Sequence, residues 1–196
     1  MITTLRYYNT NFERFFNSTV HSDLSALYSS FLPLVREGGH ILDLGAGSGR
    51  DSKFFIDNQF KVTAVDGSAK LCELSSKFIG QEVLCKTFDQ IDDFEIYDGI
   101  WSCASLLHLP KKELTIVLQK CISALVPNGI FFLSFKYGDF EGFREGRYYT
   151  DLTEMSFCDL IKEYHSIEIV KLFKTEGVSS LNNNTLWLNI LIRKIS

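Results

Sequence analysis

Short apolar runs alternate with amphipathic segments from residue 40 onward, and this alternation constrains the fold more than any other feature of the chain. The runs HILDLG, KVTAVD, QEVLCK, YDGIWSCA and IFFLSF each have the length of a buried strand. The segments RDSKFFIDNQ, SAKLCELSSKFIG and KKELTIVLQKCISAL carry apolar residues at helical spacing. Strands that alternate with helices form a parallel sheet covered on both faces, with right-handed crossovers. The sequence therefore predicts a doubly wound α/β architecture.

Both ends of the chain extend this pattern. Apolar residues recur every three or four positions over residues 11–35, which predicts one or two helices before the first strand. Near the other end, a helix over TEMSFCDLIKEY is followed by the strand-like runs SIEIVKLFKT and TLWLNILIRK, which a short polar loop joins. Runs joined in this way pair antiparallel. We expect a single domain over residues 1–196, with a helical cap over 1–37 and an α/β core over 38–196.

Capping residues mark several helix ends. Ser68 is placed to cap the amino end of the helix that Gly80 closes. Pro127 and the pair Asn128-Gly129 are expected to stop the long helix before the strand IFFLSF.

Composition excludes several classes of protein. A formal net charge of −4 gives no excess of Lys and Arg that would bind a nucleic-acid backbone. No run approaches the roughly 20 apolar residues that are needed to span a bilayer. The first residues have no continuous apolar core, so we expect no secretory signal and a cytoplasmic protein. Five cysteines without a C-x-x-C pair indicate buried thiols in a reducing compartment and no metal site. The oligomeric state is left open.

The first strand leads into Gly45-Ala46-Gly47-Ser48-Gly49, at the sheet edge where open α/β folds bind ligands. Glycines there allow a tight turn and close approach of backbone amides to a ligand, although an ordinary strand-to-helix turn has the same composition. Arg50 stands where the dinucleotide pattern would have its third spaced glycine. Asp43, just before the loop, would repel a pyrophosphate and attract an ammonium or sulfonium. The pattern indicates a partly cationic ligand.

Acidic and aromatic residues follow the next two strands. Asp66 ends the second strand, where a carboxylate can accept both hydroxyls of a ribose. Phe88 and Asp89 follow the third strand. Phe88 is able to stack on a purine and Asp89 to accept a hydrogen bond from its exocyclic amine, or else each is an ordinary core or surface residue.

A histidine and a basic loop complete the same edge. His108 follows the fourth strand and is either a general base or a hydrogen-bonded structural histidine. Lys136, Arg144 and Arg147 lie among tyrosines and phenylalanines in a loop after the fifth strand, placed to clamp a planar or anionic substrate or to remain solvated. The segment YYNTNFERFF is either a lid that brings Tyr7 or Tyr8 to the site or a helix packed on the sheet.

The motifs ILDLGAGSGRD, VTAVDGS, YDGIWSCASLLHLP and LVPNGIFFLSFKYG, in this order, resemble the class I S-adenosylmethionine-dependent methyltransferases. The resemblance implies a Rossmann-like, mostly parallel seven-stranded sheet with an antiparallel last strand. It also implies that Asp43 helps to hold the methionine ammonium, that residues 45–49 contact the methionine portion, that Asp66 binds the ribose and that Phe88 and Asp89 border the adenine. More narrowly, SLLHLP and SFKYG to GRYYTDLTE resemble small bacterial tellurite- and thiopurine-type enzymes, although GVSSLNNNTLW lacks the arginines that this group often carries there.

Together these features predict methyl transfer from S-adenosylmethionine to a small-molecule acceptor by in-line displacement. The expected cofactor contacts are Asp43, Gly45, Ala46, Gly47, Gly49, Arg50, Asp66, Gly67, Ser68, Phe88, Asp89 and Ala104. The expected acceptor contacts are Tyr8, Lys136, Tyr137, Arg144 and Arg147, with His108 as the catalytic residue. The alternatives are a non-catalytic module that binds the cofactor or its demethylated product, a nicotinamide-dependent oxidoreductase, and a tRNA or protein methyltransferase.

Overall fold

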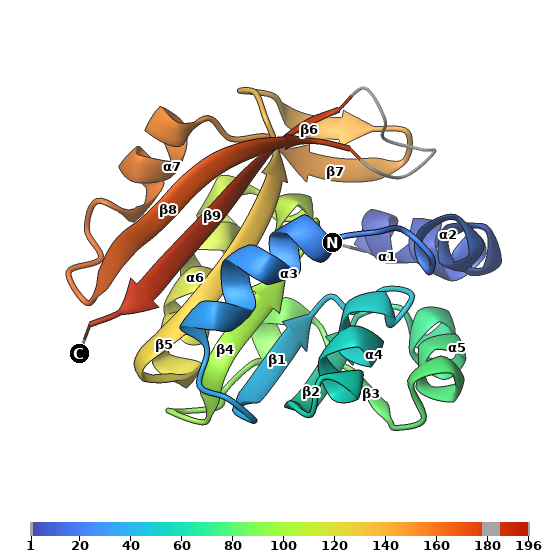
Figure 1. Ribbon diagram of the computed structural model, residues 1–196. Coiled ribbons are helices and arrows are strands. Elements are labelled where there is room, and N and C mark those ends of the chain that lie inside the picture. Colours follow the sequence, from blue (N-terminus) through green and yellow to red (C-terminus); the bar gives the residue numbers. More distant parts are fainter. Residues whose placement is uncertain (1, 178–184, 196) are drawn as a thin grey trace.

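The computed structural model describes residues 2–177 and 185–195. Seven strands form one sheet in the order β3-β2-β1-β4-β5-β9-β8 (Figure 1). β1 to β5 pair parallel, whereas β9 is antiparallel to both of its neighbours, β5 and β8. This confirms the predicted seven-stranded, doubly wound sheet. The strands are β1 (His40–Leu44), β2 (Lys61–Asp66), β3 (Val83–Cys85), β4 (Tyr97–Ser102), β5 (Leu125–Lys136), β8 (Ile167–Glu176) and β9 (Leu186–Lys194).

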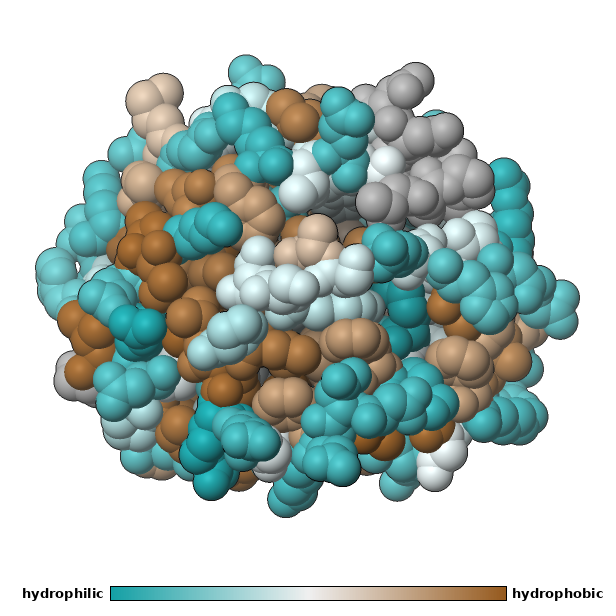
Figure 2. Space-filling view, viewed as in Figure 1, coloured by the Kyte–Doolittle hydropathy of each residue, from teal (hydrophilic) through white to brown (hydrophobic). Residues whose placement is uncertain are grey.

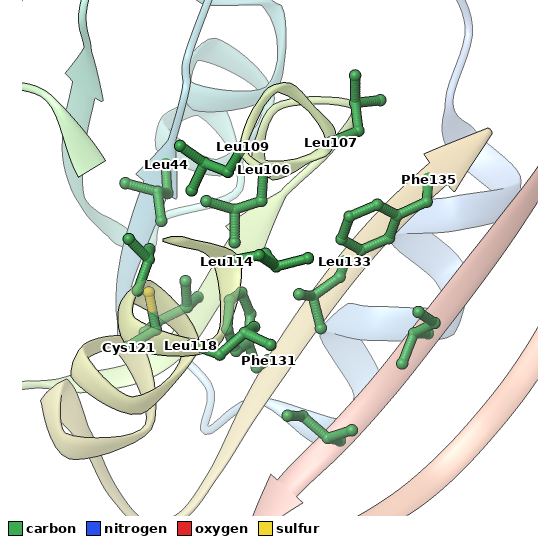
Figure 3. Packing of buried hydrophobic residues seen from close by; sticks show 14 of the residues in the cluster. Leu44, Leu106, Leu107, Leu109, Leu114, Leu118, Cys121, Phe131, Leu133 and Phe135 are labelled. Atoms are coloured by element: carbon green, nitrogen blue, oxygen red, sulfur yellow. The ribbon is translucent and has the colours of Figure 1, made fainter. Parts of the chain in front are cut away.

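Helices cover both faces of the sheet (Figure 1). On one face lie α3 (Ser25–Phe31), α4 (Arg50–Asp57) and α5 (Ala69–Ile79), and on the other lie α6 (Lys111–Ala124) and α7 (Glu154–Ile161). Each face has its own core, because alternate residues of a strand point to opposite sides. Leu114, Leu118 and Cys121 of α6 pack on Phe131 and Leu133 of β5 in the first core (Figure 3).

The second core is more aromatic. Trp101 stacks on Phe132 with ring centroids 4.0 Å apart, and Phe31 and Phe55 pack against the same indole. In the orientation of Figure 1, apolar side chains gather on the front of β8 and β9, where Val170 is partly buried against this core (Figure 2).

Two further helices, α1 (Ile2–Thr10) and α2 (Phe12–Thr19), lie at the carboxyl ends of the strands (Figure 1). α1 contacts α5 and the segment that follows β5. Over residues 11–35 the structure has α2, α3 and the short 3-10 helix η1 (Leu32–Leu34), and the helices predicted there are present. Helix α1 therefore stands above the sheet edge that the motifs occupy.

The predicted caps are found, but one boundary is wrong. Ser68 Oγ accepts the amide of Leu71, and Gly80 has the left-handed φ of +77°. The long helix, however, ends at Ala124, and β5 already begins at Leu125. Pro127 to Gly129 lie within β5, where its pairing with β4 shifts register and Asn128 has a φ of +66°. The turn residues therefore form an irregularity of the strand instead of stopping the helix.

The segment after β5 was predicted to be a basic and aromatic loop, and this prediction is wrong. The segment folds as a hairpin of β6 (Glu141–Arg144) and β7 (Arg147–Thr150). Glu145 and Gly146 join them with φ of +50° and +79°, as a two-residue turn of the primed type requires. Phe143 and Tyr148 are paired across the strands. The hairpin places its side chains more firmly than a solvated loop would.

The cysteines differ in burial. Cys72 and Cys121 are buried and Cys103 is partly buried, but Cys85 and Cys158 are exposed, so the prediction of buried thiols is wrong for these two. Cys85 ends the edge strand β3, and Cys158 lies on α7, where the helix faces away from the core. None of the helices in the described ranges is long and apolar enough to cross a membrane.

Candidate functional site

The glycine loop after β1 has a backbone that side chains would not allow. Gly45, Gly47 and Gly49 have φ of +85°, +55° and +78°. A Cβ at Gly45 would lie 2.3 Å from Ser105 Cβ, so the loop can sit against the chain that follows β4 only without a side chain there. The amides of Gly45 and Ala46 both donate to the carbonyl of Val65, which ties the loop to β2.

Asp66, at the end of β2, is oriented by backbone amides. Its Oδ2 accepts the amide of Gly47 at 2.9 Å, and its Oδ1 accepts the amide of Ser68 at 2.8 Å. A carboxylate offers about four acceptor positions, so both oxygens can accept a further donor. Burial raises the pKa of Asp66, and these two hydrogen bonds oppose that rise. The site thus holds an acceptor carboxylate in one fixed orientation.

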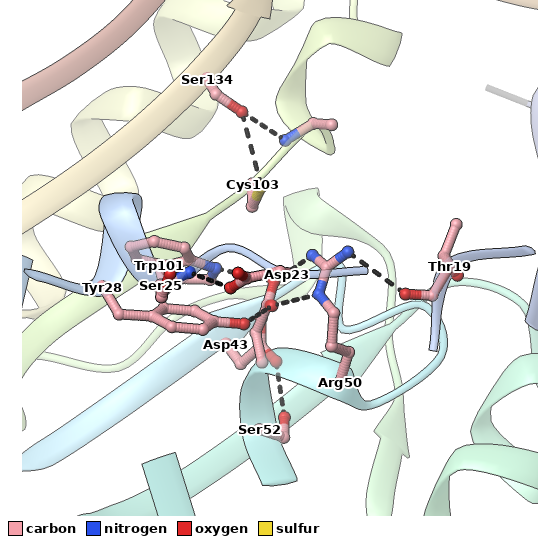
Figure 4. A network of polar contacts seen from close by, with 12 residues as sticks. Thr19, Asp23, Ser25, Tyr28, Asp43, Arg50, Ser52, Trp101, Cys103 and Ser134 are labelled. Carbon is pink, nitrogen blue, oxygen red and sulfur yellow. Dashed lines mark hydrogen bonds and ion pairs between the residues drawn. The ribbon is translucent and has the colours of Figure 1, made fainter. Parts of the chain in front are cut away.

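Asp43 lies below the loop instead of facing outward (Figure 4). Its side chain is 1% exposed, and its Oδ2 accepts Ser52 Oγ at 2.5 Å. Burial, reinforced by the charge of Asp51, raises the pKa of Asp43 to about 8. Burial therefore favours the neutral form of this carboxyl group and separates it from the sheet edge.

Asp51 in the first turn of α4 is the acid that faces the edge. Its oxygens accept Tyr28 Oη at 2.5 Å, Trp101 Nε1 at 2.9 Å and two nitrogens of Arg50 at 2.6 and 2.9 Å (Figure 4). Burial opposes its ionisation, but the guanidinium of Arg50 and the hydrogen bonds outweigh burial and hold the pKa of Asp51 below its ordinary value. Asp51 is therefore a fixed carboxylate, and Arg50 partly neutralises it.

A tyrosine and a histidine meet across the edge. His108 belongs to the short 3-10 helix η3 (Leu106–His108), and its Nε2 lies 2.7 Å from Tyr8 Oη of α1. Its Nδ1 lies 2.6 Å from the carbonyl of Tyr148. Burial lowers the pKa of His108 to about 4; the carbonyl of Tyr148 opposes this, and the charges of Arg147 and Lys136 add to it. His108 is therefore neutral at pH 7.

Cations and aromatic rings form the wall beyond this pair. Lys136 Nζ lies 4.5 Å from the ring centroid of Tyr149, and the guanidinium of Arg147 lies 4.5 Å from that of Tyr7. Such contacts hold a cation over a ring without neutralising its charge. Arg144, in contrast, pairs with Asp151. Among the described residues, no carboxylate lies within ion-pair distance of Lys136, so this end of the site is positive.

All these elements surround a cavity of about 340 Å³. The charged residues that line it are the acids Asp23, Asp51, Asp66 and Glu176 and the bases Arg50, Lys86, Lys136 and Arg147. The predicted residues that line the cavity are Tyr8, Gly45, Ala46, Gly47, Arg50, Asp66, Gly67, Phe88, Ala104, His108, Lys136 and Arg147.

Six predicted residues do not line the cavity: Asp43, Gly49, Ser68, Asp89, Tyr137 and Arg144. Asp43 is covered, Gly49 packs on Ile79 of α5, Ser68 caps that helix, and Arg144 turns to Asp151. Asp89, in the 3-10 helix η2 (Phe88–Gln90), is exposed. Tyr137 lies under Lys174 outside the cavity. Their backbone and packing support the lining residues.

The structure adds lining residues that the sequence analysis did not select. Asp51, directly after the loop, was recognisable from its position in the first helical turn. Leu5 and Phe15 of the cap also line the cavity, as do Thr175, Trp187 and Asn189 of β8 and β9. Nothing in their local sequence distinguishes them from ordinary strand and helix residues, because only the fold brings them to this edge.

Comparisons with known proteins agree with this geometry. Residues 41–129, just under half of the chain, match the family model described as methyltransferase domain. The matched range contains the glycine loop, Asp66 and His108.

Several solved structures share the fold. The 1,6-didemethyltoxoflavin-N1-methyltransferase of Burkholderia thailandensis, solved with 1,6-didemethyltoxoflavin and S-adenosylhomocysteine, has a TM-score of 0.76 at 21% identity, covering 98% of this chain and 87% of that one. The N-methyltransferase NodS of Bradyrhizobium japonicum WM9, in complex with S-adenosylhomocysteine, has a TM-score of 0.72 at 14% identity, and the match covers 95% of this chain and 98% of NodS. The [4+2]-cyclase SpnF has a TM-score of 0.70 at 12% identity, and the match covers 86% of this chain and 79% of SpnF. At these identities the likeness establishes the Rossmann-like methyltransferase fold.

Proposed function

We propose that this chain binds S-adenosylmethionine and transfers its methyl group to a small-molecule acceptor. The observation that carries the proposal is the pairing of a close-approach glycine loop with the oriented carboxylate of Asp66 at the tips of adjacent strands. The match of residues 41–129 to a methyltransferase domain supports it independently.

The residues present fit the cofactor. Each oxygen of Asp66 accepts one amide and has capacity for a ribose hydroxyl. The absence of a side chain lets Ser105 pack on Gly45 and Leu5 pack on Gly67, and both glycines line the cavity together with Phe88. For the methionine ammonium we propose attraction by the charge of Asp51, which lines the cavity. The oxygens of Asp51 already accept four hydrogen bonds, so Asp51 acts through its charge and not as a direct acceptor, while Asp43 acts indirectly through the packing of the loop.

Bound at this site, the cofactor supplies a methyl group on a sulfonium, which an acceptor nucleophile takes by in-line displacement. The protein's part is to align the acceptor and to exclude water. The helical cap suits that task, because Leu5 lies over Gly67 and Phe15 lies over Gly47. Tyr8 brings the cap into hydrogen-bond contact with His108.

The positive end of the cavity suits a planar or anionic acceptor. Lys136 of β5 and Arg147 of β7 would contact it. Arg144 would act through the hairpin that carries Arg147, and Tyr137 through the backbone next to Lys136. The narrower resemblance to tellurite- and thiopurine-type enzymes is consistent with a small acceptor.

Two measurements test the proposal. Isothermal titration with S-adenosylhomocysteine reports cofactor binding, and formation of S-adenosylhomocysteine from S-adenosylmethionine across a panel of small aromatic carboxylates, phenols, amines and thiols reports transfer. We expect both binding and turnover. Binding without turnover of any acceptor would favour the non-catalytic module, and absence of binding would refute the proposal.

A further inference from the structure

Three groups from distant parts of the chain form one hydrogen-bonded line at the edge of the cavity. Tyr8 Oη of α1 lies 2.7 Å from His108 Nε2, and His108 Nδ1 lies 2.6 Å from the carbonyl oxygen of Tyr148 in β7. A carbonyl oxygen only accepts hydrogen bonds, so Nδ1 carries the imidazole proton. Nε2 is therefore the unprotonated nitrogen, and it accepts the hydroxyl of Tyr8.

This line is fixed and faces the cavity. Tyr8 and His108 both line it, and His108 is 8% exposed. The rings of Tyr8 and Tyr149 pack on the imidazole with centroids 5.5 and 4.9 Å away. A second contact holds the cap to the same strand, because the amide of Tyr148 donates to Thr4 Oγ1 at 3.0 Å. The hydroxyl of Tyr8 is thus held between the cavity and an unprotonated nitrogen.

The charges nearest His108 are positive, whereas the carboxylate of Asp66 acts on Tyr8. The titratable groups near His108 are Tyr8 of α1, Arg147 and Tyr149 of β7, and Lys136 of β5. Among the described residues, the only carboxylate within ion-pair distance of Arg147 is the exposed Glu145, at 3.4 Å. The two cations oppose a positive charge on His108 as long as nothing neutralises them.

We propose that Tyr8 and His108 form a proton relay for an acceptor that carries an anionic group and a protonated oxygen or nitrogen nucleophile. The anionic group binds Lys136 and Arg147 and thereby permits His108 to accept the proton. This inference rests on the proposed function and adds to it the class of acceptor and a catalytic role for Tyr8.

The step balances without a further reagent. A lone pair of the acceptor oxygen or nitrogen forms the bond to the methyl carbon, and the electron pair of the broken C–S bond stays on sulfur. The proton of the acceptor passes to Tyr8 Oη as the proton of Tyr8 passes to His108 Nε2. His108 becomes an imidazolium whose Nδ1–H still donates to the carbonyl of Tyr148, and it loses the added proton to solvent after the product leaves.

A first experiment measures the charge of His108 without turnover. The imidazole resonances of the protein bound to S-adenosylhomocysteine are titrated with pH, alone, with benzoate and with benzamide, and His108→Asn assigns the signal. We expect benzoate to raise the pKa of His108 by about one unit or more and neutral benzamide to leave it unchanged. Failure of benzoate to bind, or a pKa of His108 that benzoate does not change, overturns the anionic acceptor.

A second experiment separates a relay from a purely structural contact. Wild type and Tyr8→Phe are compared with 4-hydroxybenzoate, whose phenol must lose a proton, and with 4-mercaptobenzoate, whose more acidic thiol reaches the site as a thiolate. We expect Tyr8→Phe to lower kcat for the phenol by about 100-fold or more, with little change in KM, and to lower it far less for the thiolate. His108→Asn should act in the same way, and the double variant should be no worse than either single variant.

Tyr164→Phe is the matched control, because the hydroxyl of Tyr164, after α7, donates to the carbonyl of Thr115 and Tyr164 does not line the cavity. It should preserve the phenol activity. Equal losses on phenol and thiolate in Tyr8→Phe overturn the relay, as does turnover of neither probe by a wild type that binds the cofactor. Failure to bind S-adenosylhomocysteine refutes the proposed function itself, so the two failures are distinct.

Discussion

Replacing His108 by asparagine should remove a large part of the protein's sensitivity to acid. The pKa of His108 is lowered from 6.5 to about 4, chiefly by burial. The folded state therefore has its full stability above pH 6.5 and loses stability as the pH falls towards 4, because the unfolded chain binds the proton first. Asparagine does not titrate, and its side-chain amide can still donate to the carbonyl of Tyr148.

The size of the effect follows from the two pKa values. At about pH 4.5 the unfolded histidine is almost fully protonated and the folded one largely neutral, which costs the folded state about 2.5 kcal/mol. The limit well below pH 4 is about 3.4 kcal/mol, from 1.36 kcal/mol for each pKa unit. His108 is nearly buried, so solvent screening reduces these values little.

The assay is urea unfolding of wild type and His108→Asn at about pH 7.5 and about pH 4.5. The difference between the two proteins cancels the other groups that titrate in this range. We expect the free energy of unfolding of the wild type to fall by about 2.5 kcal/mol more than that of the variant between these pH values. Parallel pH dependences would refute a neutral, buried His108, and the relay would then lack its proton acceptor.

Two more stability predictions concern the loop and its buried acid. Gly45→Ala should lower the free energy of unfolding by about 2–5 kcal/mol, because alanine meets both the left-handed φ and the clash with Ser105. Gly80→Ala has a similar φ but open space around it, so it should lower the free energy of unfolding by only about 1–2 kcal/mol. Equal losses in urea unfolding would contradict the clash. Because the pKa of Asp43 is raised, its ionisation destabilises the fold as the pH rises from about 4 to about 8. Asp43→Asn, which can still accept Ser52, should abolish that part of the decline, and an unchanged pH slope would show that Asp43 is ionised.

Most of the fold was predictable because its signals are local. Each apolar run from β1 to β5 has the length of a strand, and Ser68 and Gly80 are cap residues that act within one turn of the helix. The hairpin of β6 and β7 was missed because charged and aromatic residues obscure its alternation. Its turn signal, Glu145-Gly146, is weaker than the usual Asn-Gly or Asp-Gly pair.

The site was predictable where topology alone decides it. Parallel strands end at one edge, so a glycine loop after β1 and Asp66 after β2 had to be neighbours. That Asp51 lines the cavity and Asp43 does not was harder to predict, because the orientation of Asp51 depends on Tyr28 and Trp101, which approach from α3 and β4. The contact between Tyr8 and His108 joins residues 100 positions apart, and no local pattern encodes it.

The most direct test of the central claim is isothermal titration of S-adenosylhomocysteine into wild type, Asp66→Asn and the surface control Asp92→Asn. We predict binding to wild type and to the control. Loss of a charge-assisted hydrogen bond to Asp66, worth about 1.5–3 kcal/mol, should weaken binding to Asp66→Asn by about 10- to 150-fold. Absence of binding to wild type, or equal affinity in all three proteins, would contradict a nucleoside held by the carboxylate at the end of β2.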